Sequence, residues 1–165
     1  LNDPSESVRF HTALNFSGQV KDPRLTDRFC ALLNDPSANV RQASGQALAR
    51  LQDPRAVEPL CKALANPDAH VRMRAAQALC EIKDPRAVDA LIAALHDENA
   101  QCRVDILYAL WNIGDRKAVP AAIGMLKDAN ASVRQEAVRT LMNLTRQNFG
   151  EDAGKWQAWW ENEGK

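Results

Sequence analysis

Hydrophobic residues recur along this chain with the spacing of amphipathic helices. One stripe follows the pattern i, i+4, i+7, i+8 and i+11, which places its members on one face of a helix. Its members are Val71, Ala75, Ala78, Leu79 and Ile82. A second stripe predicts a shorter helix, with Ala87, Val88, Leu91, Ile92 and Leu95 on its apolar face. The pattern therefore predicts pairs of helices, each with one face to bury.

The helix pairs repeat at an interval of 31 residues. A dipeptide ending in Arg marks this interval at Val40-Arg41, Val71-Arg72, Cys102-Arg103 and Val133-Arg134, and Val8-Arg9 precedes the first by 32 residues. An Asp-Pro-Arg series at residues 22–24, 53–55 and 84–86 has the same interval. The sequence predicts repeats 1–32, 33–63, 64–94, 95–125 and 126–147, followed by a different segment at 148–165.

Prolines mark where the helices begin. Six of the eight prolines directly follow Asp or Asn, which predicts an N-cap side chain followed by Pro at the first helical position. Pro59 and Pro120 fall about a turn later. Because proline has no N–H, we expect each of these two residues to remove one helical hydrogen bond and weaken its helix.

Two helices of this length cannot cover each other's apolar faces, so stacking against neighbouring repeats must bury them. The repeat Asp-x-x-Val-Arg-x-x-Ala-x-x-Ala-Leu, followed by Asp-Pro-Arg-Ala-Val-x-x-Leu, resembles the PBS-lyase HEAT-like repeats of the bilin-lyase type. The resemblance implies an all-α fold, a right-handed α-α superhelix or armadillo-like solenoid, as a single domain over residues 1–165. It leaves the function open, because such repeats occur in lyases and in scaffolds.

The last segment departs from the repeat. Residues 148–152 replace the expected short helix, and Trp156, Trp159 and Trp160 then lie on one helical face. We expect a terminal cap, in which the aromatic rings cover the core of the last repeat while residues 161–163 face water. An aromatic ligand pocket is the alternative. The first repeat shows no such cap, and the chain does not begin with Met, which favours a longer chain or a complex.

The charges of the chain cancel. The 21 basic and 21 acidic residues give a formal net charge of zero, so we expect neither nucleic acid nor a membrane as partner. The four cysteines occupy packing positions of the repeat: Cys30, Cys61, Cys80 and Cys102. We interpret them as small buried hydrophobes, and Trp111 and Met142, at the repeat position of Cys80, as packing residues too. Unpaired cysteines favour a reducing compartment, the cytoplasm.

Motifs that carry chemistry are absent from the sequence. His11, His70 and His96 share no helical face and have no metal-ligand spacing, and no phosphate loop, nucleophile elbow or poised carboxylate pair occurs. The sequence therefore predicts no enzyme, no cofactor and no metal site.

The arginines of the repeat could form a basic ladder for phosphates: Arg9, Arg41, Arg72, Arg103 and Arg134. An equally regular series of acids stands at the turn between the two helices: Asp22, Asp53, Asp84 and Asp115. The family resemblance implies that this Arg and this Asp pair across neighbouring repeats. A charge-assisted bond of that kind would orient each loop and leave little charge for an anion.

A partner is expected on the polar side of the longer helices. Helical spacing places there His70, Met73, Arg74, Gln77 and Glu81, with equivalent sets at Asn39, Gln42, Ala43, Gln46 and Arg50, at Gln101, Val104, Asp105, Tyr108 and Asn112, and at Ser132, Gln135, Glu136, Arg139 and Asn143. The middle combines apolar area with charged edges, as interface centres do. The candidate patch is Met73, Arg74, Gln77, Val104, Asp105 and Tyr108; ordinary solvated surface is the alternative.

These features favour a non-catalytic scaffold that binds a protein or a peptide on the concave surface of the solenoid. The family resemblance permits a second function, a subunit like the bilin lyases or their tetrapyrrole-handling chaperones. HEAT-like DNA glycosylases suggest a third, DNA binding, which the near balance of charges on the predicted inner surface disfavours. A purely architectural segment of a larger protein is the fourth.

Overall fold

The computed structural model describes residues 2–16 and 22–163, and the chain divides into two compact units, residues 1–87 and 88–165. All regular structure in the described ranges is helical. Among these helices, none is long and apolar enough to cross a membrane.

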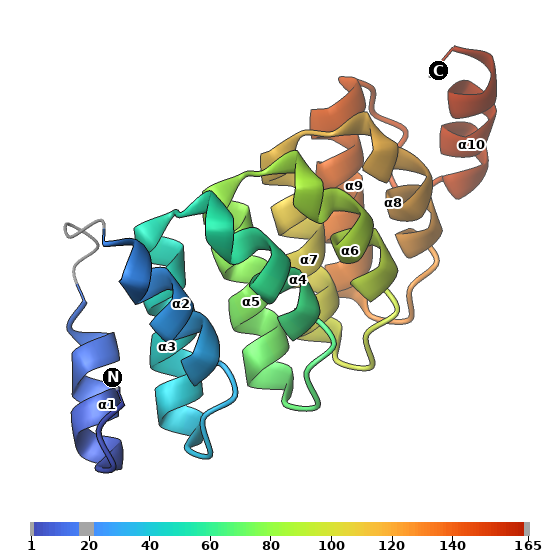
Figure 1. Ribbon diagram of the computed structural model, residues 1–165. Coiled ribbons are helices and arrows are strands. Elements are labelled where there is room, and N and C mark those ends of the chain that lie inside the picture. The colour runs from blue at the N-terminus through green and yellow to red at the C-terminus, as the bar shows by residue number, and fades with distance from the viewer. Residues whose placement is uncertain (1, 17–21, 164–165) are drawn as a thin grey trace. The chain divides into compact units, whose positions relative to one another are not determined.

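The first unit consists of two layers of helices. The longer layer holds, in chain order, α1 (Glu6–Leu14), α3 (Ala38–Leu51) and α5 (Ala69–Ile82), which lie side by side (Figure 1). The other layer holds α2 (Pro23–Leu32) and α4 (Val57–Ala63), and the 3-10 turns are η1 (Pro54–Ala56) and η2 (Pro85–Ala87). Helix α2 packs on α3 and α4 packs on α5, so each short helix covers the long helix that follows it.

The second unit has the same plan and a different end. Its elements are α6 (Val88–Ala94), α7 (Ala100–Ile113), η3 (Arg116–Ala118), α8 (Val119–Met125), α9 (Ala131–Thr145) and α10 (Ala153–Asn162). Helix α6 packs on α7, α8 packs on α9, and α7 lies beside α9. Helix α10 packs on α8, where a further repeat would otherwise continue the stack.

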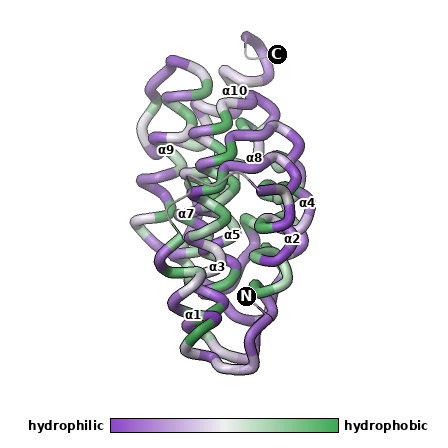
Figure 2. Tube along the Cα trace, turned by 60° about the vertical axis from the view of Figure 1, so that its left-hand side comes forward, coloured by the Kyte–Doolittle hydropathy of each residue, from purple (hydrophilic) through white to green (hydrophobic). Residues whose placement is uncertain are grey.

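The predicted apolar stripes form the core. On α5 the side chains of Val71, Ala75, Ala78 and Leu79 are fully buried, and Ile82 at the helix end is half-buried. On the short helix after it Val88 and Leu91 are buried in the same way, and so is Leu95 directly after that helix. Hydrophobic and hydrophilic segments follow one another along helices such as α1 and α5 (Figure 2), as expected where one face is buried and the other faces solvent.

The proline prediction is correct for the short helices and wrong for the long ones. Asp22 and Asp53 precede Pro23 and Pro54 and cap the turns that follow, as predicted. Before α3 the N-cap is Ser37, and Pro36 stands outside the helix. The carboxylate of Asp35 instead accepts the backbone N–H of Ser37, at 2.9 Å. Asp-Pro there forms the loop that leads into the helix.

Pro59 and Pro120 do not interrupt their helices as expected. A 3-10 turn comes first, so α4 begins at Val57 and α8 begins at Val119. Both prolines therefore lie in the first turn of an α-helix, where a backbone donor has no obligatory partner.

Four of the long helices, α3, α5, α7 and α9, end in left-handed backbone geometry. Gln52, Lys83 and Arg146 have φ values of 48°, 56° and 63°, and Gly114 has a φ of 79°. At each of these positions the backbone N–H bonds a carbonyl four residues earlier, which terminates the helix.

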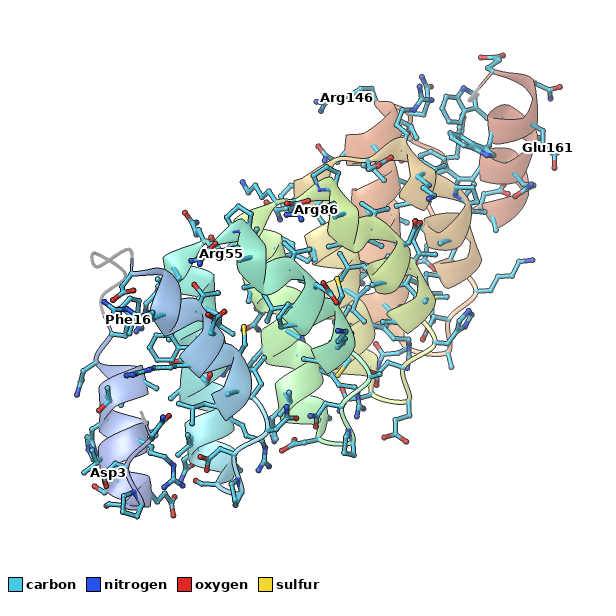
Figure 3. All side chains as sticks on the ribbon, in the orientation of Figure 1. Asp3, Phe16, Arg55, Arg86, Arg146 and Glu161 are labelled. Carbon is cyan, nitrogen blue, oxygen red and sulfur yellow. The ribbon has the colours of Figure 1, made fainter. Side chains whose placement is uncertain are left out.

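Helix α10 is the predicted cap. Trp156 is completely buried, and its indole Nε1–H donates to the carbonyl of Gly150 at 2.8 Å. The ring of Phe149 meets it edge-on at 4.9 Å between centroids. The guanidinium of Arg116 lies 5.5 Å above the ring of Trp160, and Glu161 points away into solvent (Figure 3). The rings cover the end of the second unit, so they are used as packing.

Candidate functional site

The repeat arginines hold the loops of neighbouring repeats. Each guanidinium Nη1 donates to the carbonyls five and six residues earlier, as Arg41 does to Asp35 and Pro36. The other edge of the guanidinium binds an acid of the next repeat, in the pairs Arg9–Asp35, Arg41–Asp68 and Arg103–Asp128. These hydrogen bonds lower the pKa of Asp35, Asp68 and Asp128. With both edges engaged, these arginines do not form a phosphate ladder.

The acids predicted for this pairing are the wrong ones. Asp22, Asp53 and Asp84 each accept the backbone N–H two residues later and pair with the arginine at that same position. Arg55 and Arg86 stand together at this edge of the first unit (Figure 3). The acceptors of the repeat arginines, such as Asp35, lie instead in the loop before the next long helix. This loop lies beside the first turns of the long helix that carries the arginine. The series ends at Arg134, whose Nε bonds Glu151 of the capping segment at 2.9 Å.

The predicted partner residues lie on two helices. Met73, Arg74 and Gln77 are on α5 of the first unit, and Val104, Asp105 and Tyr108 are on α7 of the second unit. Met73, Arg74, Val104 and Asp105 are half-buried, whereas Gln77 and Tyr108 are exposed. That all six form one surface for a partner stays a prediction.

In the first unit one of these residues, Gln77, lines a polar hollow. A hollow of about 420 Å³ lies between α3 and α5, lined mainly by Gln46, Arg50, Gln77 and Glu81. Arg50 has a structural role, since its Nη1 donates to the carbonyls of Leu14 and Phe16 at the end of α1. Arg74 packs against α3, where a Cβ added to Gly45 would come within 2.4 Å of the Arg74 Cβ.

The equivalent position in the second unit is an aromatic groove. It lies between α7 and α9, has a volume of about 510 Å³, and is lined by Tyr108, Trp111, Glu136, Arg139 and Met142. The rings of Tyr108 and Trp111 are 5.0 Å apart between centroids and tilted by 45°. Tyr108 is 45% exposed and Met142 is 39% exposed, large fractions for such apolar side chains. We call this hollow the aromatic groove.

An ion pair stands within the lining of this groove. Glu136 is buried, and one of its oxygens accepts from Arg139 Nη1 at 3.1 Å. The side chain of Glu136 is 9% exposed and that of Arg139 is 72% exposed. A buried carboxylate needs such a partner, because an unpaired charge is costly to bury. Glu136 therefore fixes one edge of a guanidinium that is otherwise in contact with solvent.

Sequence patterns placed some of these residues wrongly. Ala43 and Glu136 were expected on the solvated surface, but both are buried because their position faces the neighbouring long helix. Trp111 and Met142 were expected in the core, but Trp111 is half-buried and Met142 is exposed. The signal that would have found the groove is the combination of Tyr108 and Trp111 with their equivalents 31 residues later, Arg139 and Met142.

The prediction that the four cysteines are buried packing residues is confirmed for two of them. Cys80 and Cys102 are buried, but Cys30 and Cys61 are half-buried, and none of the four is in a disulfide. Burial raises the pKa of the Cys30 thiol to about 11 and also raises the pKa of Cys61. Within the described ranges no group of three or more His, Cys, Asp or Glu residues is placed to hold a metal ion.

Solved structures with this fold include one natural assembly and several designed proteins. The chain is similar to one from the complex of CpcE and CpcF of phycocyanin lyase from Nostoc sp. PCC7120, with 28% identity and a TM-score of 0.77. The alignment covers 89% of this chain and 63% of that chain, so this chain spans less than two thirds of its length.

Two designed structures share the fold at lower identity. An engineered protein is 20% identical, with 99% of this chain and 87% of that chain covered and a TM-score of 0.68. A designed armadillo repeat protein in complex with the peptide (KR)4 is 16% identical, with 99% and 90% covered and a TM-score of 0.66. The predicted fold class, an armadillo-like helical solenoid, is confirmed by these similarities together with the helix pairs of each unit.

No curated protein was found to match the chain. The family pattern for HEAT repeats matches residues 1–69, 26–103 and 88–153, and these ranges together include all the helix pairs described above. By that match, and by the arginine and acid markers that recur in each repeat, this chain belongs to the HEAT repeat family.

Proposed function

We propose that this chain is a non-catalytic subunit of a bilin-lyase type of assembly, which holds a tetrapyrrole in the aromatic groove and acts together with a second protein. One observation carries the proposal. The chain is 28% identical, over 89% of its length, to a chain of a phycocyanin lyase that was solved as a complex of CpcE and CpcF. Partner and ligand are both suggested by this relative.

The aromatic groove supports the ligand part of the proposal. Small-molecule sites are concave, mostly apolar and about 300–1000 Å³ in volume, with a few polar groups that orient the ligand. The groove has a volume of about 510 Å³ and combines Tyr108, Trp111 and Met142 with the charged pair Glu136 and Arg139. A conjugated tetrapyrrole offers flat apolar rings for stacking and polar edges for the charged pair.

The raised pKa of the Cys30 and Cys61 thiols supports a non-catalytic role. A cysteine nucleophile reacts as the thiolate, and reactive cysteines have a lowered pKa. Here burial raises the pKa of Cys30 and Cys61, so their thiols stay protonated at neutral pH. The subunit would then bind and orient the pigment, while any bond-forming group belongs to the partner or to the acceptor protein.

Titration with biliverdin, a linear tetrapyrrole, tests the proposal. We expect a shift of its absorption band with the wild type, and about tenfold weaker binding or more with Trp111→Ala, since stacking area is lost. Trp160→Ala is the matched control, because it also removes a tryptophan but lies on α10 outside the groove. An unchanged spectrum with the wild type would exclude tetrapyrrole binding; equal affinity for both variants would exclude this groove.

The partner part needs a separate measurement. Native mass spectrometry of the chain isolated from its source cell should give a complex heavier than 18.3 kDa, with a second polypeptide in fixed ratio. A chain that is isolated only as a monomer would contradict the second half of the proposal and leave the pigment half standing.

A further inference from the structure

We propose that Arg139 binds a carboxylate of the ligand in the aromatic groove, with Glu136 as the positioning residue that holds its guanidinium in place. The inference rests on the proposed function and adds to it a chemical requirement. The ligand must carry an acid group beside its flat apolar rings, and the acid must lie at the edge of the groove where Arg139 stands.

The first step is the number of donors that Arg139 has available. A guanidinium carries five N–H donors. The repeat arginines use most of theirs, as Arg103 shows with four bonds from Nε, Nη1 and Nη2 and a side chain that is 14% exposed. Within the described part of the chain, Arg139 makes one hydrogen bond, from Nη1 to Glu136. The side chain of Arg139 is 72% exposed, so the donors that do not bond Glu136 are open to a ligand at the aromatic groove.

The second step is the position of Arg139 in the repeat. The residues at the same place in the three preceding long helices are Gln46, Gln77 and Tyr108. The polar hollow of the first unit therefore has glutamine where the aromatic groove has a cation. The repeat itself does not require a positive charge here, since it folds with neutral residues at the other positions. Arg139 thus stands out as a local addition to one groove.

The third step is the part played by Glu136. Its equivalents in the preceding repeats are Ala43, Arg74 and Asp105, so the repeat folds with an apolar, a basic or an acidic residue here and does not require the acid. Glu136 accepts from Nη1 alone, so Nε and Nη2 of the guanidinium are left for another acceptor. A carboxylate that approaches this edge can accept two parallel N–H bonds, the strongest geometry for such a pair. Arg139 would then bridge Glu136 and the ligand, and the buried acid would keep its partner.

The ligand class follows from the two halves of the groove. Tyr108 and Trp111 supply ring faces that are tilted by 45°, which suits a ligand of several flat rings joined by hinges. Arg139 adds a site for one carboxylate at the edge. Biliverdin, with its linked pyrrole rings and propionate groups, has both features, and its dimethyl ester keeps the rings but removes the acids.

The experiment compares these two probes on the full chain. With wild type, we expect biliverdin to bind about tenfold more tightly than its dimethyl ester, since a bidentate charged pair is lost. Arg139→Gln should bind biliverdin about tenfold more weakly than wild type and bind the ester equally well. Arg146→Gln is the charge-matched control, since it removes an exposed arginine of the same unit, and it should change neither affinity.

A second variant guards against a fold defect. Arg139→Lys keeps a cation beside buried Glu136 but cannot offer two parallel donors, so it should lose part of the preference for the acid while its unfolding midpoint stays that of the wild type. Equal affinity of the wild type for acid and ester, or no change with Arg139→Gln, would overturn the inference and leave the proposed function intact. Failure of the wild type to bind either probe would overturn both.

Discussion

At the scale of single residues, the same amino acid has two different roles in this chain. Arg9, Arg41 and Arg103 are largely buried and bond both to the loop before their own helix and to the next repeat. Arg139 is exposed and makes one bond. The difference is set by what surrounds the guanidinium, so residue type alone could not separate structural arginines from a candidate ligand-binding one.

A substitution in the Arg103–Asp128 pair tests how much the repeat arginines stabilise the fold. Both side chains are largely buried, at 14% and 9% exposure, and the two bonds are 2.8 and 2.9 Å long. We expect Asp128→Asn to lower the free energy of unfolding at pH 7 by about 1.5–3 kcal/mol, because hydrogen bonds to a buried charged group are lost. Urea unfolding would measure it.

Acidity provides an independent check of the same pair. The bond to Arg103 lowers the pKa of Asp128 in the folded state below its unfolded value of about 4. The stabilisation is therefore complete above that unfolded value and is lost as the pH falls toward the folded pKa. The difference between wild type and Asp128→Asn should shrink in this acid range. Lys62→Ala, which breaks the exposed pair with Glu58, should change the unfolding midpoint far less at pH 7, because water screens an exposed pair.

At the scale of elements, α3, α5, α7 and α9 each end on a residue in the left-handed region, and three of those residues are not glycine. Gln52, Lys83 and Arg146 adopt positive φ values, whereas Gly114 fills the same place in α7. Residues with a Cβ adopt this conformation at a cost, so the helix ends store a small strain that the packed repeats maintain.

Replacing Lys83 by glycine should relieve that strain. We expect Lys83→Gly to raise the free energy of unfolding by about 0.5–1 kcal/mol, since glycine adopts a φ of 56° without a steric penalty. Thermal unfolding would show a higher midpoint. The reverse change, Gly114→Ala at a φ of 79°, is the matched control and should lower the midpoint. A lower midpoint for Lys83→Gly would mean that its aliphatic chain matters more than its backbone.

At the scale of the whole molecule, periodicity alone predicted the helix pairs and their buried stripes. The helical spacing of Val71, Ala75 and Leu79 places all three on one face of a helix, and that face is buried. The groove could not be predicted in this way. Whether Glu136 is buried, and whether Trp111 is covered, depends on how closely neighbouring long helices approach, and a periodic pattern does not contain that distance. The pairing acids were misassigned for the same reason.

The terminal cap can be tested separately from the repeats. Trp156 is completely buried between α10 and the last repeat, so we expect Trp156→Ala to destabilise the second unit by about 3–5 kcal/mol. Hydrogen exchange should then increase in α8 and α9. Trp160→Ala, on a half-buried residue of the same helix, should have a much smaller effect. Unchanged exchange in α8 after Trp156→Ala would show that α10 merely rests on the surface.

Glu151 ends the series of arginine contacts between repeats. Glu151 lies outside the 31-residue register and accepts a hydrogen bond from Arg134, the repeat arginine of the last repeat. Arg9, Arg41 and Arg103 instead bond an acid of the following repeat. Additional repeats placed after α10 would find Arg134 already taken and the apolar end covered by tryptophan. A repeat fused after α10 would therefore lack the arginine contact and the apolar surface on which the repeats stack. We expect such a fused repeat to pack as a separate domain.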